Sequence, residues 1–251
     1  EGKRLANVNV ASSSESSNFT TIAPQSDWST TPDAAYLHYC PNETIGGLEF
    51  AFVPKSDVPL IADMSSTILS RPIDVDQFSV IYAGAQKNIG PAGLCIVIVR
   101  RALLGRAREN IPAMLNWKIA AENDSMYNTP PTFGIYLAGL VFEWLESLGG
   151  LDAMYAINKR KAQTLYKVID DSEFYANPVD PQCRSLMNVP FTLADATLDK
   201  AFLEQAEEAQ LLNLKGHRSV GGMRASIYNA VEQASVDALC EFMHRFEKDN
   251  G

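Results

Sequence analysis

The sequence is poor in the residues that build metal and disulfide sites. Its three histidines form no HxH or HExxH pattern, so we expect no metal site. Its four cysteines are widely spaced and form no CxxC pair. We interpret them as free thiols in a reducing compartment and expect a cytoplasmic protein. The four are Cys40, Cys95, Cys183 and Cys240.

Long hydrophobic runs and an excess of positive charge are also absent. No apolar run reaches the roughly 18 residues that a membrane-spanning helix needs, so we expect no membrane contact. The first residues, Glu1-Gly-Lys-Arg-Leu5, have no signal-peptide character and are typical of the middle of a domain. The 30 acidic and 21 basic residues give a net charge of −9, which argues against nucleic acid as a partner. A small anionic ligand remains possible, because it needs only a local cationic pocket.

What the chain contains is typical of a globular protein with a sizeable core: 251 residues, 46% of them hydrophobic and 20% charged. Residues 11–31 are rich in Ser and Thr and are expected to form a loop. Short apolar runs then alternate with loops, which is typical of α/β proteins whose strands are covered on both faces. The expected strands are 35–39, 60–62, 80–82 and 94–99, and the last run is the clearest.

Two long helices are expected at 129–148 and 151–170. The first would have Thr129 as its N-cap, two prolines in its first turn and two glycines after its end. Further strands at 186–193 and 223–228 alternate with helices at 196–210 and 235–248, the last capped by Ser235. This order predicts part of a large, mainly parallel α/β domain in residues 1–150 and a small α+β domain in residues 151–251.

Lys87 is the most informative residue, because it follows an apolar, β-prone run and is flanked by glycines. Burial there would lower the pKa of the amine and let it attack a carbonyl. Asp63 ends another apolar run, and ligands of open α/β sheets gather outside the carboxyl ends of the strands. The pair suggests a lysine-bound pyridoxal phosphate with a carboxylate opposite its ring nitrogen. For either residue alone, an ordinary solvent-facing position at a strand end stays open.

Asn128 and Thr129 precede a predicted helix start, where backbone N–H groups and the helix dipole favour an anion. The prolines that follow remove N–H donors, so the two side chains would have to supply the contacts. Simple helix capping by Thr129 is the alternative.

The segment 211–230 has a local positive charge, since it contains basic residues and no acidic one. Arg224 on a strand could bind a carboxylate through two parallel hydrogen bonds, while His217 and Arg218 suit a phosphate. A solvated basic turn is the alternative.

Five stretches form a longer and more specific pattern. They are HYCPNETI at 38–45, ADMSSTILSRP at 62–72, YAGAQKNIGPAG at 82–93, SMYNTPPTF at 125–133 and GHRSVGGMRASIYN at 216–229. Together they resemble the phosphoserine aminotransferases, class V members of the fold-type I pyridoxal-phosphate enzymes. The resemblance runs from residue 35 to the end, and it implies that fold, with the C-terminal part of the large domain followed by the small domain.

The resemblance implies a role for each matching residue. Lys87 would be the Schiff-base lysine and Asp63 the partner of the pyridine nitrogen. Thr44 would contact the phenolic-oxygen side of the cofactor and Gln86 its phosphate. Asn128 and Thr129 would reach the cofactor phosphate of the neighbouring subunit, which implies a homodimer with shared active sites. Arg224 would bind the substrate α-carboxylate, and His217 and Arg218 its phosphate.

The implied reaction is amino transfer from glutamate to 3-phosphooxypyruvate, giving 3-phospho-L-serine and 2-oxoglutarate for serine biosynthesis. In bacteria the same reaction on 4-phosphohydroxythreonine serves pyridoxine biosynthesis. Family members are longer on the N-terminal side, by roughly a third of this chain. That part supplies a phosphate-binding cup, a stacking aromatic ring and a substrate-binding arginine. Two alternatives therefore stay open, a catalytically incomplete fragment and another class V enzyme such as a related transaminase or a desulfurase-like lyase.

Overall fold

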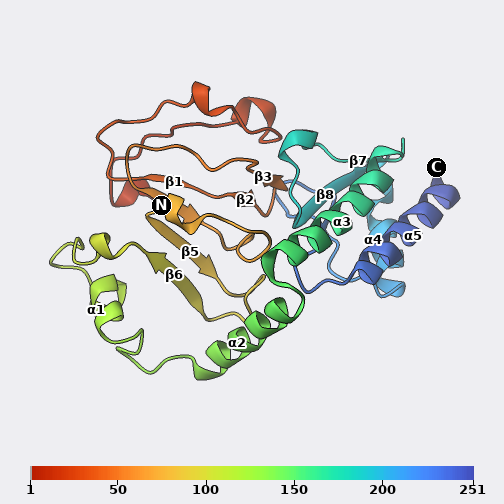
Figure 1. Ribbon diagram of the computed structural model, residues 1–251. Coiled ribbons are helices and arrows are strands. Elements are labelled where there is room, and N and C mark those ends of the chain that lie inside the picture. The colour runs from red at the N-terminus through yellow and green to blue at the C-terminus, as the bar shows by residue number, and fades with distance from the viewer. Residues whose placement is uncertain (1) are drawn as a thin grey trace.

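The computed structural model describes residues 2–251 and contains two main sheets with helices beside them (Figure 1). The larger sheet has the strand order β1-β4-β5-β6. Its strands are β1 (Leu37–Tyr39), β4 (Leu60–Asp63), β5 (Val80–Gly84) and β6 (Cys95–Val99). The pairs β1–β4 and β4–β5 are parallel, while β6 runs antiparallel to β5. The mainly parallel sheet predicted from the apolar runs is confirmed.

The central strands of this sheet are buried mainly on one face. Ala62 on β4 and Ile81 and Ala83 on β5 are all at most 1% exposed. They belong to one apolar cluster with Tyr39 and Ile89. Ala62 pairs with Ile81, and Ala83 lies two residues further along β5, so all three side chains lie on one face of the sheet. The other face of these strands is only partly covered.

The segment 94–99 does form a strand, but the prediction that both of its faces are covered is wrong. β6 lies at the sheet edge, and its Val97 and Ile98 are 39% and 40% exposed. An apolar run indicates what a strand can bury, and it carries no information about which element covers it.

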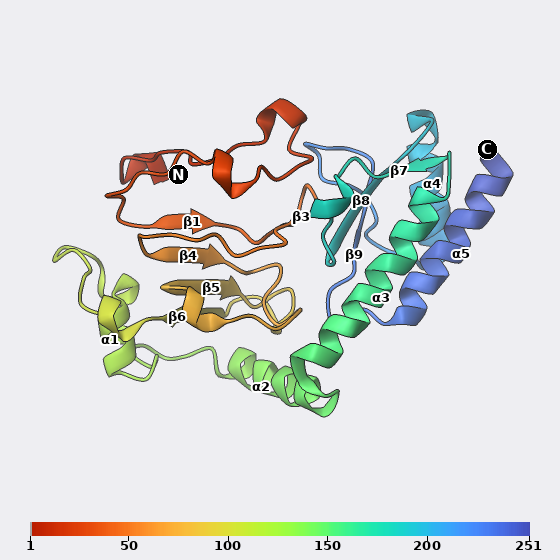
Figure 2. The same ribbon diagram turned by 45° about the horizontal axis from the view of Figure 1, so that its top comes forward.

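The second half of the structure is an antiparallel sheet packed against helices. Its strands are β7 (Tyr175–Ala176), β8 (Asn188–Leu193) and β9 (Met223–Ser226), in the order β7-β8-β9. The helices are α3 (Gly150–Asp170), α4 (Asp199–Glu208) and α5 (Gln233–Asn250). Figure 2 shows α3 and α5 side by side. Their apolar faces join β8 and β9 in a second apolar cluster that is separate from the first.

The helix between the two halves begins later than predicted. α2 spans Thr132–Ser147, and its N-cap is Pro131 without a side-chain hydrogen bond. The predicted cap at Thr129, with prolines inside the first turn, is therefore wrong. Thr129 and Pro130 each precede a proline, and that position disfavours the helical conformation, so the chain stays extended until Pro131. Two glycines with positive φ, Gly149 at 101° and Gly150 at 77°, then turn the chain from α2 into α3.

Two smaller corrections concern the other helices. The last helix starts at Gln233 after Glu232, so Ser235 is not its N-cap. A short helix, α1 (Trp117–Glu122), was not predicted. It is capped by the side chain of Asn116, which accepts a hydrogen bond from the Lys118 N–H at 3.0 Å.

The remaining elements are short. A small antiparallel pair, β2 (Asn42–Glu43) with β3 (Leu48–Glu49), lies between the halves. Residues 11–31 contain no strand and no α-helix, as predicted. The 3-10 helices among the described residues are Gly2–Arg4, Glu15–Ser17, Gln25–Asp27, Val75–Gln77, Arg101–Leu103, Ala113–Leu115, Pro181–Cys183 and Ala196–Leu198.

The division into domains at residue 150 stays a prediction, although the two apolar clusters draw their members from either side of it. None of the helices in residues 2–251 is long and apolar enough to cross a membrane. Within the same residues, no group of three or more His, Cys, Asp or Glu side chains is placed to hold a metal ion.

Candidate active site

The site begins at the ends of two neighbouring parallel strands. Asp63 is the last residue of β4, and it lies opposite Tyr82 in the register with β5. After β5 the chain turns tightly, because the N–H groups of Ile89 and Gly90 both donate to the Ala85 carbonyl. This turn carries Lys87. The carboxyl ends of β4 and β5 therefore bring Asp63 and Lys87 to one edge of the sheet, as predicted.

Lys87 is half-buried and held by a side chain from another segment. Its Nζ donates to the Thr44 hydroxyl oxygen at 2.5 Å. Burial lowers the pKa of the Lys87 amine, and the nearby Arg224 charge lowers it further. The charges of Asp63 and Glu43 act in the opposite direction. Asp63, Glu43 and Arg224 therefore lie close enough to act on the Lys87 amine, although they come from distant parts of the sequence.

Asp63 is held by its own loop. Oδ1 accepts from the Ser65 N–H at 2.9 Å and from the Ser65 hydroxyl at 2.6 Å. The same hydroxyl oxygen accepts from the Gly84 N–H at 3.1 Å, which ties the Asp63 loop to the end of β5. The carboxylate is therefore fixed by one of its oxygens.

Three side chains beside Asp63 and Lys87 were not assigned a role from the sequence. His38 stacks on Tyr82 with ring centroids 5.9 Å apart, and His38 Nε2 lies 3.0 Å from the Tyr82 hydroxyl. Burial lowers the pKa of His38, while the Asp63 charge raises it. Burial also raises the pKa of the Cys40 thiol to about 12, and Glu43 and Asp63 add to this effect. His38 and Cys40 both lie in the HYCPNETI stretch, so the signal was present but could not be interpreted without the fold.

Arg224 reaches the site from β9 in the other half of the molecule. Its Nε atom is buried and has no hydrogen-bond partner in residues 2–251. A buried guanidinium N–H without a partner is costly unless an anionic ligand accepts from it. The amine of lowered pKa, the oriented carboxylate and this unpaired Arg224 Nε together fit pyridoxal phosphate and a carboxylate substrate.

No hydrogen bond or ion pair joins the other predicted residues to Lys87 within residues 2–251. Gln86 is exposed, and its side chain folds back against Gly84. Asn128 and Thr129 are exposed in the segment before α2. His217 Nδ1 contacts the Ser219 hydroxyl at 2.7 Å, and Arg218 is exposed in the same turn. The structure therefore brings together Thr44, Asp63, Lys87 and Arg224.

Comparison with known proteins places this geometry in a family. Residues 2–239 match the family model for class-V aminotransferases. The phosphoserine aminotransferase of Hahella chejuensis is 62% identical over 251 residues, which are 100% of this chain and 70% of that protein. Among solved structures, phosphoserine aminotransferase from Bacillus circulans subsp. alkalophilus superposes with a TM-score of 0.97 at 47% identity, over 99% of this chain and 70% of that one.

A pyridoxal-phosphate-bound relative is also similar. The phosphoserine aminotransferase of Trichomonas vaginalis was solved with that cofactor, and it matches with a TM-score of 0.92 and 43% identity. The match covers 97% of this chain and 70% of that one. Because sequence, fold and the residues around Lys87 all agree, the chain belongs to the phosphoserine aminotransferase family of class-V aminotransferases.

Proposed function

We propose that this chain performs the amino transfer of its family, with pyridoxal phosphate bound at Lys87. The substrates would be glutamate and 3-phosphooxypyruvate, and in the reverse direction 3-phospho-L-serine and 2-oxoglutarate. The observation that carries the proposal is the half-buried Lys87 amine, which contacts Thr44 and lies in the electrostatic field of Asp63 and Arg224.

Each of these residues has a definite chemical task in the proposed reaction. The bound cofactor supplies an electron-withdrawing ring that stabilises negative charge on the substrate carbon. Because burial lowers its pKa, Lys87 is more easily neutral, and a neutral amine can both bind an aldehyde and accept a proton. The Asp63 carboxylate, oriented by Ser65, would keep the ring nitrogen protonated. Thr44 would orient the Lys87 amine.

Binding of the substrate and of the cofactor phosphate is part of the same proposal. Arg224 would bind the α-carboxylate, and its unpaired buried Nε supports this role. His217 and Arg218 would bind the substrate phosphate. Gln86, Asn128 and Thr129 would contact the cofactor phosphate, the last two across a dimer interface.

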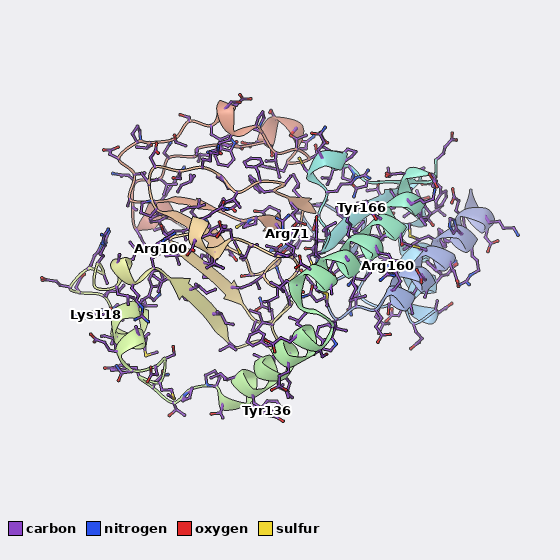
Figure 3. The ribbon with its side chains drawn as sticks, in the orientation of Figure 1. Arg71, Arg100, Lys118, Tyr136, Arg160 and Tyr166 are labelled. Atoms are coloured by element: carbon purple, nitrogen blue, oxygen red, sulfur yellow. The ribbon has the colours of Figure 1, made fainter. Side chains whose placement is uncertain are left out.

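A homodimer is proposed because α2 exposes a large apolar surface. Phe133 and Tyr136 are 71% and 61% exposed, and Figure 3 shows Tyr136 on the outer side of α2. Exposed apolar patches of this kind are typical of protein interfaces. Asn128 and Thr129 lie a few residues before this surface, so a second copy packed on α2 would lie beside them. A cytoplasmic location is also proposed, supported by the four free cysteines.

The direct test is titration of the purified chain with pyridoxal phosphate, followed by borohydride reduction and peptide mapping. We expect a single covalent label on Lys87. A label elsewhere, or none, would contradict the proposal and favour a catalytically incomplete fragment. Glutamate formation from 3-phospho-L-serine and 2-oxoglutarate then tests the substrate, because a different class V enzyme would bind the cofactor at Lys87 without this activity.

Asp63→Asn should separate cofactor binding from turnover. The amide keeps the size and the hydrogen bond from Ser65 but loses the charge that keeps the ring nitrogen protonated. We expect the label on Lys87 to persist and the turnover number to fall by about 10²–10³-fold, as for loss of one stabilising group in an active site. Single-turnover absorbance measurements with glutamate would give the rate. An unchanged rate would remove Asp63 from the mechanism.

Arg224→Met should weaken substrate binding more than cofactor binding. A charge-assisted hydrogen bond contributes about 1.5–3 kcal/mol, so the KM for glutamate should rise by about 10- to 100-fold. Arg245→Met is the matched control, because Arg245 lies on α5 in the small sheet's helical layer. We expect its KM to equal that of the unaltered chain. Equal KM values for the Arg224 and Arg245 variants would contradict the assignment.

A further inference from the structure

The two apolar clusters of the molecule are joined by buried polar side chains. Nine residues that are at most 4% exposed form this contact layer, which we call the polar seam. They are Asn42, Ser66, Ser70, Asn88, Asn158, Lys161, Ser185, Asn188 and Asn229. None of them belongs to either apolar cluster. In Figure 3 the labelled Arg71, which follows Ser70, marks this contact region between the larger sheet and α3.

The polar seam is formed in part by the same chain segments as the candidate active site. Asn88 follows Lys87, Asn42 lies two residues before Thr44, and Ser66 lies three residues after Asp63. Asn229 lies five residues after Arg224 on the same segment. Every segment that supplies a side chain to the site therefore also supplies a buried polar side chain to the seam.

Asn88 and Asn229 join the Lys87 turn to the Arg224 segment. The Asn229 N–H donates to Asn88 Oδ1 at 3.1 Å. Asn88 Nδ2 donates to the Ile68 carbonyl at 3.0 Å, and Asn229 Nδ2 donates to the adjacent Leu69 carbonyl at 2.9 Å. These two asparagines thus bind the loop after Asp63 as well. Three segments of the active site meet at this one joint.

Helix α3 contributes the third asparagine of this joint, Asn158. Asn158 Nδ2 donates to Asn229 Oδ1 at 2.8 Å and to the Ser70 carbonyl at 3.1 Å. A second group of bonds lies beside it, in which Asn42 Nδ2 donates to Asn188 Oδ1 at 3.0 Å and to the Ser66 hydroxyl at 2.9 Å. Apolar surfaces can slide over one another, whereas buried hydrogen bonds are directional and are lost when partners move.

We infer that the Asn88–Asn229–Asn158 joint is a positioning device that fixes Arg224 relative to Lys87. The inference rests on the proposed function, since it concerns the substrate carboxylate that Arg224 would bind. The three asparagines are not among the residues proposed to bind cofactor or substrate, and their hydrogen bonds are to other parts of the chain. They act through the backbone segments that carry Arg224 and Lys87, so their loss misplaces the carboxylate-binding group while the chemistry at Lys87 remains intact.

Asn229→Ala tests the inference. It removes both side-chain bonds of the joint, to Asn158 and to Leu69. We expect the KM for glutamate to rise about tenfold, since small misplacements of binding groups have effects of this order or larger. The turnover number and the covalent label on Lys87 should change less than twofold. A variant that was only less stable would lose active protein, and therefore apparent turnover, at unchanged KM.

Phe246→Leu is the matched control for stability. Phe246 is 2% exposed in the apolar cluster of the small sheet and its helices, away from the polar seam. Phe246→Leu should lower the melting temperature by about as much as Asn229→Ala does and leave the KM for glutamate unchanged. Asn158→Ala should raise the KM in the same direction as Asn229→Ala, and the double variant should show less than the sum of the two effects, because both remove the same bond.

Hydrogen exchange of the cofactor-free chain tests the joint without any activity. In Asn229→Ala the amides of Ile89 and Gly90, next to Asn88, should exchange at least about tenfold faster than in the unaltered chain. Unchanged exchange at 85–90 together with an unchanged KM would overturn the inference. If the unaltered chain takes up no pyridoxal phosphate at Lys87, the proposed function fails, and the exchange result alone decides whether the joint exists.

Discussion

Lys87→Ala is expected to abolish amino transfer, with a fall in rate of at least about 10³-fold. The variant lacks both the amine that would bind the cofactor aldehyde and the group that would move the proton. Its absorbance spectrum with pyridoxal phosphate should be that of the free cofactor. Borohydride treatment should leave no label on the peptide that contains position 87.

The fold should survive this change. Lys87 is only half-buried, and Thr44, its hydrogen-bond partner, can bind water instead. Removing a partly buried amine of lowered pKa also removes an unfavourable desolvation. Lys200→Ala on α4 is the matched control, since Lys200 is 84% exposed, and it should label at Lys87 like the unaltered chain. Covalent labelling that persists in Lys87→Ala would refute the assignment of the cofactor lysine.

Of the variants described, Lys161→Met is expected to be the most destabilising. It should lower the free energy of unfolding by about 2–4 kcal/mol at pH 7. Lys161 on α3 is completely buried. Its Nζ donates to the carbonyls of Ile227, Tyr228 and Val231 at 3.1, 2.8 and 2.9 Å. Three carbonyl acceptors match the three N–H groups of an ammonium. Methionine fills the volume of the stem but leaves all three acceptors without a donor.

A lysine on the exposed side of the same helix supplies the matched control for Lys161→Met. Lys159→Met, two residues away on the exposed side of α3, should change the free energy of unfolding by less than about 0.5 kcal/mol. Urea denaturation monitored by tryptophan fluorescence would give both values. If the Lys161 and Lys159 variants were equally stable, the three carbonyl contacts would carry no net energy.

The pH dependence of stability gives an independent check on Lys161. Burial lowers the pKa of its amine from 10.5 to about 8. Below pH 8 both the folded and the unfolded chain carry the proton, so the cost of burying the charge is fully present. Between about pH 8 and 10.5 the folded chain has lost a proton that the unfolded chain still binds, so stability should rise with pH, by at most about 1.4 kcal/mol per unit. The difference between the unaltered chain and Lys161→Met isolates this effect from the tyrosines and cysteines that titrate in the same range.

Much of the fold could be predicted because it depends on local patterns. The apolar runs that end at Asp63 and precede Lys87 form β4 and β5, and the turn residues place both side chains at one sheet edge. The long helices also follow from amphipathic patterns, and α3 lies within one residue of its prediction. The start of α2 was missed because capping rules were applied at Thr129, although Pro130, the first residue of the predicted helix, precedes a second proline, and that position disfavours the helical conformation.

The candidate site was predictable in part. Asp63 and Lys87 were identified from strand ends and Arg224 from a locally basic segment, and the resemblance added Thr44. No local rule places Thr44 on the Lys87 amine or Arg224 beside it, because hydrophobic periodicity indicates which face of a segment is buried and not which distant segment covers it. The roles of Gln86, Asn128, Thr129, His217 and Arg218 stay predictions.

The sequence by itself determined the two sheets, the order of the elements and the positions of Asp63 and Lys87 at strand ends. Only the tertiary structure decided the polar seam, in which asparagines from distant segments become buried and hydrogen-bonded to one another. It also decided the exposed position of β6 and the unpaired Nε of Arg224. The physical reason is that local patterns fix what a segment can bury, whereas burial of a polar group requires partners from distant segments, and those exist only once the chain has closed.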